Sequence, residues 1–319
     1  MSAPEAVELQ ALEITSGDTR ARFLTYGATL THFEVGGENY IVSLPDHAYL
    51  GEHPYVGSLV GPVANRIADG RFTIDGETHQ VATNENGNTL HSGPDGLDRQ
   101  VWDVIKRTSD TLVLEHVMPD GHQGYPGPLT LTVEARVEPS TLTIDYTATT
   151  KRPTPVSLTH HTYFDMPGLD GISELGLIVY APSVVKVDSM SIPTDYDAEL
   201  KIGDPLDLRT ITELGTRRID NSYNIGAASN WNGLREAAAL YGPSSQLHVW
   251  TDLPAVQVYT GEALEGVGLP PRAGLAIEPQ YAPDLVNTDR AEDVILRPGE
   301  TYRYTIRYVV SPPDELVGG

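Results

Sequence analysis

In the stretch Leu131-Thr-Val-Glu-Ala-Arg-Val-Glu-Pro-Ser-Thr-Leu-Thr-Ile-Asp-Tyr146, apolar and polar residues alternate on both sides of a short polar break. A period of two places the apolar side chains on one face of an extended strand and the polar ones on the other. The break, Glu138-Pro-Ser-Thr141, has the composition of a turn. The stretch therefore predicts two antiparallel strands that form a hairpin with one buried face.

The same alternation recurs elsewhere in the chain. Thr301-Tyr-Arg-Tyr-Thr-Ile-Arg-Tyr308 repeats it, and Gly70-Arg-Phe-Thr-Ile74 runs into Asp75-Gly76, a dipeptide typical of two-residue hairpins. The 30 glycines and 24 prolines are spread along the chain, which indicates many short strands joined by turns. We therefore predict an all-β fold, a large antiparallel β-sandwich.

One segment is ambiguous between helix and strand. Leu234-Arg-Glu-Ala-Ala-Ala-Leu240 has helical propensity, but it is short and ends close to Gly242-Pro243. The segments that follow, Gln246-Leu-His-Val-Trp250 and Val256-Gln-Val-Tyr259, are predicted to be paired strands. Because its neighbours are strands, we favour a strand for residues 234–240 as well.

The organisation of the chain indicates one domain over residues 1–319, with loose ends at about residues 1–6 and 312–319. There is no cysteine, and the N-terminal residues lack the basic and apolar parts of a secretory signal. A cytoplasmic location is therefore expected. No apolar run approaches the ~20 residues that a membrane helix needs.

The charge is strongly negative, because 21 basic side chains stand against 44 acidic ones, which gives −23. Such a surface repels nucleic acid, anionic lipid and polyanionic substrates, and it favours neutral small molecules or cationic partners. A solvated acidic surface is the simplest explanation. Adaptation to salt is a second explanation, and composition leaves it open.

The polar residues that could carry chemistry lie in turn-rich or strand-like segments. They are Asn65, Arg66, His91, His160, His161, Asp220 and Glu278. Arg66 could hold ligand hydroxyls with its planar donors, or it could form an ordinary surface ion pair. Asp220, which follows two arginines, has the same two interpretations.

Glu278 and the consecutive pair His160-His161 are the candidates that most strongly suggest acid–base chemistry. Glu278 follows the apolar run Leu275-Ala-Ile277, and a carboxylate beside a buried strand is desolvated, which raises its pKa toward that of a working base. In an extended segment, neighbouring side chains face opposite sides, so only one of His160 and His161 should face a given cleft. A carboxylate and an imidazole together can move one proton off an oxygen and another onto a neighbouring one.

In their joint order, these segments resemble the aldose 1-epimerase (galactose mutarotase) family over about residues 20–310. The matching segments are Val63-Ala-Asn-Arg-Ile67, Thr89-Leu-His-Ser-Gly93, Thr159-His-His-Thr-Tyr-Phe164, the region around Asp220, Val256-Gln-Val-Tyr-Thr-Gly261, Ile277-Glu-Pro-Gln280 and Leu296-Arg-Pro-Gly-Glu-Thr-Tyr302. The family's fold is a large antiparallel β-sandwich with an open cleft, in agreement with the strand pattern.

The resemblance implies an isomerase that opens and recloses the ring of a free aldose without a metal or cofactor. It assigns Glu278 as general base and His161 as general acid, with His91 stabilising charge at the ring oxygen. It assigns five further residues to substrate binding, namely Arg66, Asp220, Asn65, His160 and Gln280. The implied partner is a monosaccharide, a hexose or a pentose, and the protein could be a monomer or a homodimer.

Three positions depart from the family pattern. His160 stands where asparagine is usual, Asp165-Met166 stands where Asn-Leu is common, and Gly61-Pro62 stands where Gly-Arg is usual. None of these changes removes the proposed acid or base. His160 raises the question of which imidazole does the work, and all three changes bear on sugar preference.

Four alternatives remain at this point. A hexose-6-phosphate 1-epimerase would need cations for its dianionic substrate, which the acidic chain disfavours. A glycosidase would use Asp220 and Glu278 as its carboxylate pair, and a metal site would gather His91, His160, His161 and Glu278. A carbohydrate-binding protein would keep the cleft without turnover.

Overall fold

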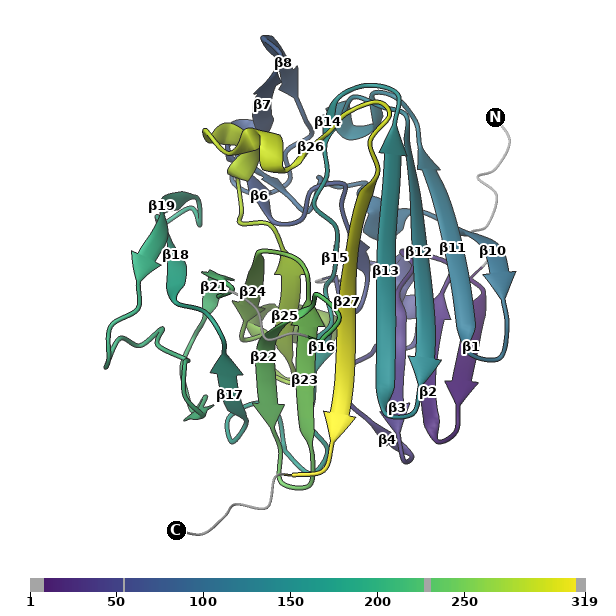
Figure 1. The fold of residues 1–319 in the computed structure, drawn as a ribbon, viewed down its shortest axis with the longest axis vertical. Helices are drawn as coiled ribbons and strands as arrows, with labels where there is room; N and C mark the ends of the chain where they lie inside the picture. The colour runs from purple at the N-terminus through teal and green to yellow at the C-terminus, as the bar shows by residue number, and fades with distance from the viewer. Residues whose placement is uncertain (1–8, 54, 227–230, 314–319) are drawn as a thin grey trace.

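The computed structural model describes residues 9–53, 55–226 and 231–313, and it consists of antiparallel sheets joined by turns and short 3-10 helices (Figure 1). All pairings between the strands named below are antiparallel, so the prediction of an all-β fold is confirmed. Within these residues, no helix has the length and apolar character needed to cross a membrane. Most of both predicted loose ends, residues 1–6 and 314–319, lies outside the described residues.

The largest sheet has nine strands and contains the hairpin on which the fold prediction rests. Its strands, in spatial order, are β10 (Asp103–Arg107), β11 (Thr111–Met118), β12 (Leu129–Glu138), β13 (Thr141–Thr150), β27 (Tyr302–Ser311), β23 (Gln246–Thr251), β22 (Arg235–Tyr241), β17 (Gly176–Val179) and β20 (Thr212–Glu213). β12 and β13 pair along their whole length and turn at Pro139-Ser140. The ambiguous segment is strand β22, so the preference for a strand there is confirmed.

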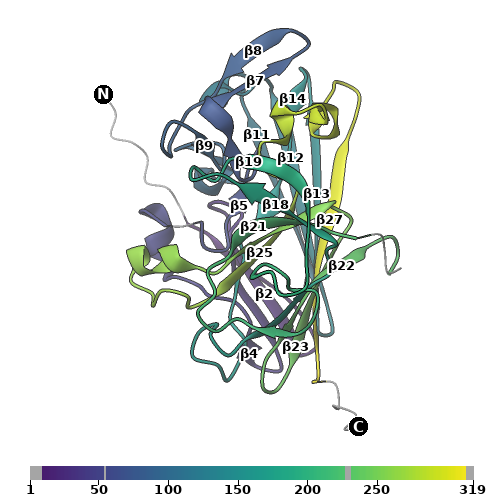
Figure 2. The ribbon, with the colours of Figure 1, turned by 90° about the vertical axis from the view of Figure 1, so that its left-hand side faces the viewer.

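A second sheet of six strands carries much of the site described below. Its strands, in spatial order, are β16 (Tyr163–Phe164), β25 (Leu275–Gln280), β24 (Ala255–Tyr259), β21 (Asp220–Asn224), β18 (Ser183–Val187) and β19 (Pro193–Glu199). All six residues of β25 are buried. Figure 2 shows β25 and β21 crossing the middle of the molecule, in front of the longer strands β12 and β13.

The predicted pairing of residues 246–250 with residues 256–259 is wrong, because β23 and β24 belong to different sheets. β23 pairs with β22 and β27, whereas β24 pairs with β21 and β25. The three residues between them do not form a hairpin turn, since Leu253 is fully buried and the Asp252 side chain accepts a hydrogen bond from the Thr305 amide of β27. The chain therefore passes from one sheet to the other at this point.

The remaining strands form one small sheet and four short pairs. The small sheet is β1 (Ala11–Ser16), β2 (Thr19–Leu24), β3 (Leu30–Val35) and β4 (Glu38–Asn39), and the pairs are β5 (Leu59–Val60) with β15 (Thr159–His160), β6 (Arg66–Ile67) with β9 (Thr89–Leu90), β7 (Arg71–Ile74) with β8 (Glu77–Gln80), and β14 (Thr154–Pro155) with β26 (Ile295–Leu296). The hairpin predicted at Asp75-Gly76 is the β7–β8 pair.

The 3-10 helices within the described residues are all short. They are η1 (Asp46–Leu50), η2 (Ala68–Gly70), η3 (Leu97–Arg99), η4 (His122–Gly124), η5 (Glu262–Val267), η6 (Leu285–Asn287) and η7 (Ala291–Asp293). None is long enough to cover a sheet face, so the layers of this fold are made of strands.

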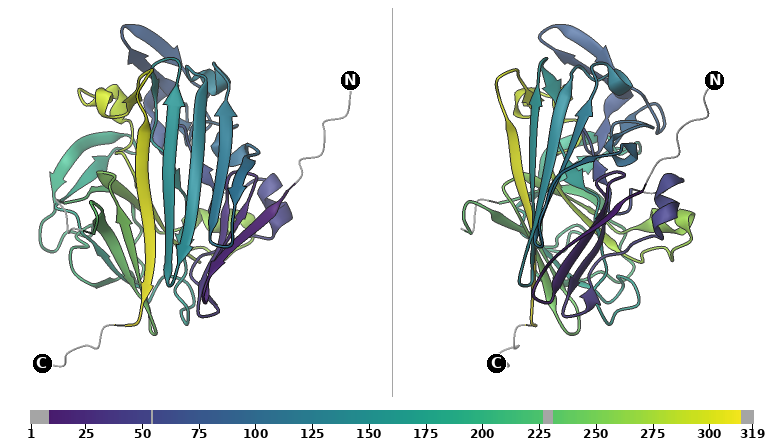
Figure 3. Two further views of the ribbon diagram at one scale, coloured as in Figure 1. Left: turned by 45° about the vertical axis from the view of Figure 1, so that its right-hand side comes forward. Right: turned by 90° about the vertical axis from the view of Figure 1, so that its right-hand side faces the viewer.

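Aromatic side chains hold the sheets together. Tyr308 of β27 contacts Phe33 of β3 with ring centroids 6.3 Å apart and Phe164 of β16 with centroids 5.1 Å apart. One ring of the nine-stranded sheet thus contacts both the four-stranded and the six-stranded sheet, and all three side chains are buried. Burying each such side chain contributes on the order of 1.5–3 kcal/mol. Figure 3 shows the N-terminal strands β1–β3 lying obliquely against the β11–β13 part of the long sheet.

Candidate active site

A cleft of about 170 Å³ lies over the six-stranded sheet, where the ends of the short strand pairs meet it. Six residues singled out from the sequence line it together: Asn65, Arg66, His91, His161, Asp220 and Glu278. The first and last of them, Asn65 and Glu278, are more than 200 residues apart in the chain. Tertiary folding therefore brings together most of the candidate residues.

Glu278 projects from the middle of β25, directly opposite Gln257 of β24. Its side chain is only 2% exposed, and its Oε2 atom has no hydrogen-bond partner among the described residues. Burial raises the pKa of Glu278 well above its ordinary value, the nearby charge of Asp220 raises it further, and Arg66 opposes the shift. The side chain is thus a buried carboxyl group whose proton affinity is increased.

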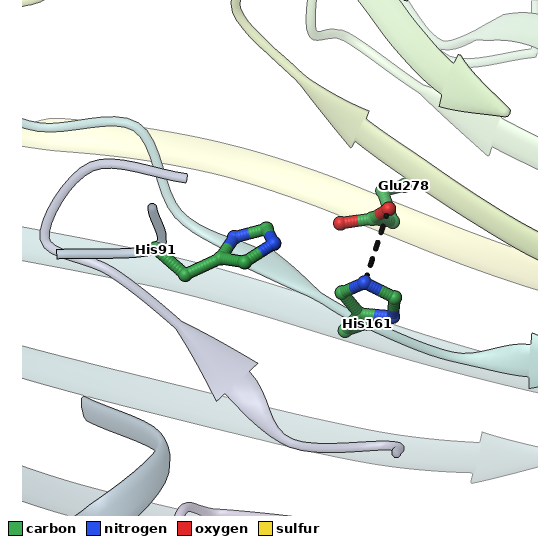
Figure 4. A group of neighbouring side chains, drawn as sticks. All are labelled: His91, His161 and Glu278. Atoms are coloured by element: carbon green, nitrogen blue, oxygen red, sulfur yellow. Dashed lines mark ion pairs between the residues drawn. The ribbon is translucent and has the colours of Figure 1, made fainter. Parts of the chain in front are cut away.

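His161 faces Glu278, with His161 Nε2 lying 3.5 Å from Glu278 Oε1 (Figure 4). Its backbone is held on both sides, because its amide donates to the Ser58 carbonyl and its carbonyl accepts from the Gly57 amide, both at 2.9 Å. The ring contacts those of Tyr55 and Tyr163, with ring centroids 5.9 Å and 4.8 Å away. Burial lowers the pKa of His161 to about 3.

The hydrogen bonds of His91 determine which of its ring nitrogens carries the proton. The Asn65 backbone amide donates to His91 Nδ1 at 3.1 Å, and an amide N–H can only donate, so Nδ1 is the acceptor. Burial lowers the pKa of His91 well below its usual value, so its ring is neutral and its proton sits on Nε2. Figure 4 shows the ring pointing toward Glu278 and His161, where the Nε2–H group can donate to a ligand oxygen.

Arg66 and Asp220 are both fixed by polar partners within the cleft. Arg66 donates from Nε to Glu85 Oε2 at 2.6 Å and from Nη2 to Glu85 Oε1 at 3.0 Å. Asp220 Oδ1 accepts from Gln257 Nε2 at 2.6 Å, and burial raises the pKa of Asp220. Arg66 therefore forms an ion pair, which was one of its two interpretations from the sequence, and it also lines the cleft. Its contact with ligand hydroxyls stays a prediction.

His160 does not line the cleft in this structure, and its contact with substrate stays a prediction. Its ring is fully buried, with Nε2 donating to the Ala28 carbonyl at 2.9 Å and Nδ1 accepting from the Tyr146 hydroxyl at 2.7 Å. The expectation that only one of the two adjacent histidines faces the cleft is met, and His161 is that one. Backbone alternation sends its neighbour into the core.

Gln280 also lies away from the cleft, although it was assigned to substrate binding. It is the last residue of β25, opposite Ala255, and it is fully buried. Its amide has no hydrogen-bond partner among the described residues. Of the residues of β25, the cleft is lined by Glu278 and not by Gln280, so the substrate contact of Gln280 stays a prediction.

A metal site built from His91, His160, His161 and Glu278 is not supported by this geometry. His160 is turned into the core, while ligand atoms of the other three lie within 4.8 Å of one another. With Nδ1 of His91 accepting from the Asn65 amide, Nε2 carries the proton and has no free lone pair for a cation. Metal binding through His91 would break this hydrogen bond.

The cleft also contains residues that the sequence analysis did not identify: Tyr55, Glu85, Leu90, Tyr163, Gln257, Tyr259 and Ala263. Period-two alternation could have found Tyr163, because it lies two residues after His161. Nothing in the local sequence points to Glu85, since its partner Arg66 is 19 residues away.

Comparison with known proteins is consistent with the fold and the cleft. Residues 10–309 match the family model described as aldose 1-epimerase. The chain is 34% identical to galactose mutarotase of Bos taurus, covering 93% of this chain and 92% of the relative, and 31% identical to aldose 1-epimerase of Escherichia coli, covering 82% and 81%. It shares the fold of a solved aldose epimerase homologue from C. elegans, with a TM-score of 0.87, 24% identity, and coverage of 96% of this chain and 100% of that one.

Proposed function

Because the chain belongs to the aldose 1-epimerase family and is an isomerase that interconverts the α and β anomers of an aldose, we propose that Glu278 is its general base and His161 its general acid. The observation that supports this assignment is the 3.5 Å separation of His161 Nε2 and Glu278 Oε1 at the buried end of the cleft. A proton donor and a proton acceptor at that spacing can act on neighbouring oxygens of one small ring.

The reaction proceeds through ring opening. Glu278 takes the proton from the C1 hydroxyl, the C1–O5 bond breaks with its electron pair moving to O5, and His161 delivers a proton to O5. The open aldehyde turns about the C1–C2 bond. On reclosure O5 attacks the other face of C1, His161 recovers its proton from O5, and Glu278 returns a proton to the C1 oxygen. No proton is consumed over the cycle.

The proton content of the pair explains how buried groups can perform this chemistry. Burial raises the pKa of Glu278 and lowers the pKa of His161, so each group alone favours its neutral form. A neutral acid with a neutral imidazole holds the same single proton as a carboxylate with an imidazolium. The reactive ion pair therefore forms by a transfer between the two residues, without exchange with solvent.

The other residues of the cleft bind the sugar in this proposal. His91 donates from Nε2 to the ring oxygen, where negative charge develops as the C1–O5 bond breaks. Arg66 and Asp220 provide a donor and an acceptor for ring hydroxyls, and Asn65 holds His91 in the required tautomer through its backbone amide. Glu278 Oε2 and Gln257 Oε1 have no hydrogen-bond partner among the described residues, so both can accept from sugar hydroxyls.

We further propose that the substrate is an uncharged aldose, with D-galactose the first to test because the bovine relative is named for it. The carboxyl groups of Glu85, Asp220 and Glu278 line the cleft, and the guanidinium of Arg66 is already paired with Glu85. A dianionic sugar phosphate would need unpaired cations. The charge of the cleft thus favours free sugars over hexose 6-phosphates.

Glu278→Gln is the first variant to measure, by polarimetry on freshly dissolved α-D-galactose. We expect the enzymatic rate to fall by about 10²–10⁴-fold, because the amide cannot accept the C1 proton, while sugar binding measured by calorimetry is largely retained. His161→Ala should cause a similar loss.

Glu236→Gln provides a matched control, since Glu236 and His248 form a second carboxylate–imidazole pair, 2.5 Å apart, on β22 and β23 outside the cleft. Its turnover should equal that of the unmodified protein. Wild-type turnover in Glu278→Gln would show that another group is the base.

A further inference from the structure

Glu85 is a carboxylate of the cleft that the reaction described above does not use. It accepts two parallel hydrogen bonds from the Arg66 guanidinium. The Glu85 side chain is 29% exposed and that of Arg66 is 12% exposed. Paired hydrogen bonds of this kind fix the plane of a guanidinium as well as its position. The orientation of Arg66 toward the cleft therefore depends on Glu85.

The loop that carries Glu85 is tied to the strands of the site. Glu85 and Asn88 exchange backbone hydrogen bonds, and the Asn84 side chain accepts from the Leu90 amide at 2.7 Å and donates to the Leu90 carbonyl at 3.0 Å. Leu90 in turn pairs with Arg66 across β9 and β6. Both ends of the Arg66–Glu85 contact are thus anchored on one small unit, which also carries His91.

Without Glu85, Arg66 would still share the cleft with other carboxyl groups. Asp220 and Glu278 line the same cleft, and the positive charge of Arg66 already acts on both carboxyl groups. An unpaired guanidinium would be drawn toward them and away from its position for sugar hydroxyls. Its charge would also no longer be neutralised by Glu85, so the cleft would repel an anionic ligand less strongly.

We propose that Glu85 is a positioning and selectivity residue, which holds the Arg66 guanidinium for sugar hydroxyls and neutralises its charge so that the cleft selects uncharged aldoses. This inference rests on the proposed role of Arg66 in sugar binding.

The test compares Glu85→Gln with the unmodified protein, using D-galactose and D-galacturonate in the same polarimetric assay. We expect KM for galactose to rise by about 10-fold with kcat nearly unchanged, because Arg66 contributes the same binding energy in ground state and transition state. The ratio of kcat/KM for galacturonate to that for galactose should increase. A loss of folding alone would not change this ratio.

Two further variants separate position from charge. Glu85→Asp keeps the negative charge but is too short for the paired contact, so KM should rise while the selectivity ratio stays at its original value. Glu34→Gln is the matched control, because Glu34 binds both Nε and Nη2 of Arg20 in the same paired manner between β3 and β2, outside the cleft. Its kinetic constants should not change.

The outcomes distinguish this inference from the proposed function. Unchanged KM and selectivity in Glu85→Gln would overturn the role of Glu85, whatever Glu278→Gln does. Normal turnover in Glu278→Gln would overturn the assignment of the base. If Glu85→Gln nevertheless shows the expected changes in KM and selectivity, the role of Glu85 is retained. An equal rise in KM in Glu34→Gln would show that the effect is not specific to the cleft, and the inference would fail.

Discussion

His91, His160 and His161 are three buried imidazoles, and their hydrogen-bond partners place them in three different states. His160 has protein partners on both ring nitrogens, and His91 accepts on Nδ1 from a backbone amide. His161 is the one whose Nε2 faces a carboxyl group, while its Nδ1 has no hydrogen-bond partner among the described residues. Residue type alone thus does not define the acid, because the proton exchange needs a titratable partner at short range.

A second buried acid, Asp98, leads to a prediction about stability. It is 1% exposed, neither of its carboxyl oxygens has a hydrogen-bond partner among the described residues, and burial raises its pKa from 3.8 to about 7. As pH rises from about 4 to 7, the unfolded chain ionises at this residue while the folded protein stays protonated, so folding stability is lost over that window. Below about pH 4 Asp98 is protonated in both the folded and the unfolded state, so it adds no pH dependence to folding stability.

Asp98→Asn should therefore stabilise the protein, and more so at high pH. At about 1.36 kcal/mol per pH unit, the gain at pH 8 should exceed the gain at pH 5 by about 2–3 kcal/mol, as measured by denaturant unfolding at both values. Asp103→Asn on the exposed strand β10 is the control and should show no such difference. Equal gains at the two pH values would contradict the assignment of a neutral Asp98.

At the scale of elements, Arg66 lies in a two-residue strand, and His91 and His161 directly follow two others, β9 and β15. β5, β6, β9 and β15 have two residues each, and a two-residue pair has little stability of its own. Their positions are fixed by the backbone around them. Asn65 and His91 both have positive φ, and they exchange a hydrogen bond from the His91 amide to the Asn65 carbonyl. The geometry of the site therefore depends on turns next to these strands.

Two glycines with positive φ test this dependence. Gly57, at φ +66°, donates its amide to the His161 carbonyl, and a Cβ there would lie 2.1 Å from the Leu30 carbonyl oxygen. Gly76, at φ +82° in the β7–β8 turn, has no atom within 4 Å of that position. Gly57→Ala should cost more than about 3 kcal/mol and lower activity, because strain and a backbone clash add together.

Gly76→Ala carries only the backbone strain, which amounts to about 1–2 kcal/mol, and its kcat should not change. Thermal unfolding and polarimetry on both variants would check the comparison. Similar losses of stability in the two variants would mean that the close contact at Gly57 relaxes at little cost.

At the scale of the whole molecule, the net charge of −23 should make folding depend on salt. Repulsion among 44 acidic side chains, with only 21 basic ones to balance them, disfavours the compact state. Screening shortens the range of this repulsion from about 10 Å at 0.1 M salt to about 3 Å at 1 M. The thermal unfolding midpoint should therefore rise with KCl over this range.

The control for this measurement is an uncharged osmolyte. Sucrose at the same osmolality stabilises by exclusion from the protein surface, so the part of the KCl effect that exceeds the sucrose effect reports on charge. A midpoint that stays constant or falls with KCl would show that acidic side chains are spaced widely enough for their repulsion to be negligible.

The sequence by itself determined the class of fold and about half of the residues that line the cleft. Period-two alternation in residues 131–146 and 301–308 sets which side of each strand is buried, and this information is local. The motifs around Arg66, His91 and Glu278 could be recognised from the sequence because each consists of a few consecutive residues.

Only the tertiary structure decided how these segments meet. The sheet to which β24 belongs, the inward turn of His160 and the position of Gln280 all depend on which strands pair, and the partners are distant in the chain. The Arg66–Glu85 ion pair and the Glu278–His161 contact have the same origin. The physical reason is that alternation orients a side chain relative to its own strand, whereas packing of the sheets selects its neighbours.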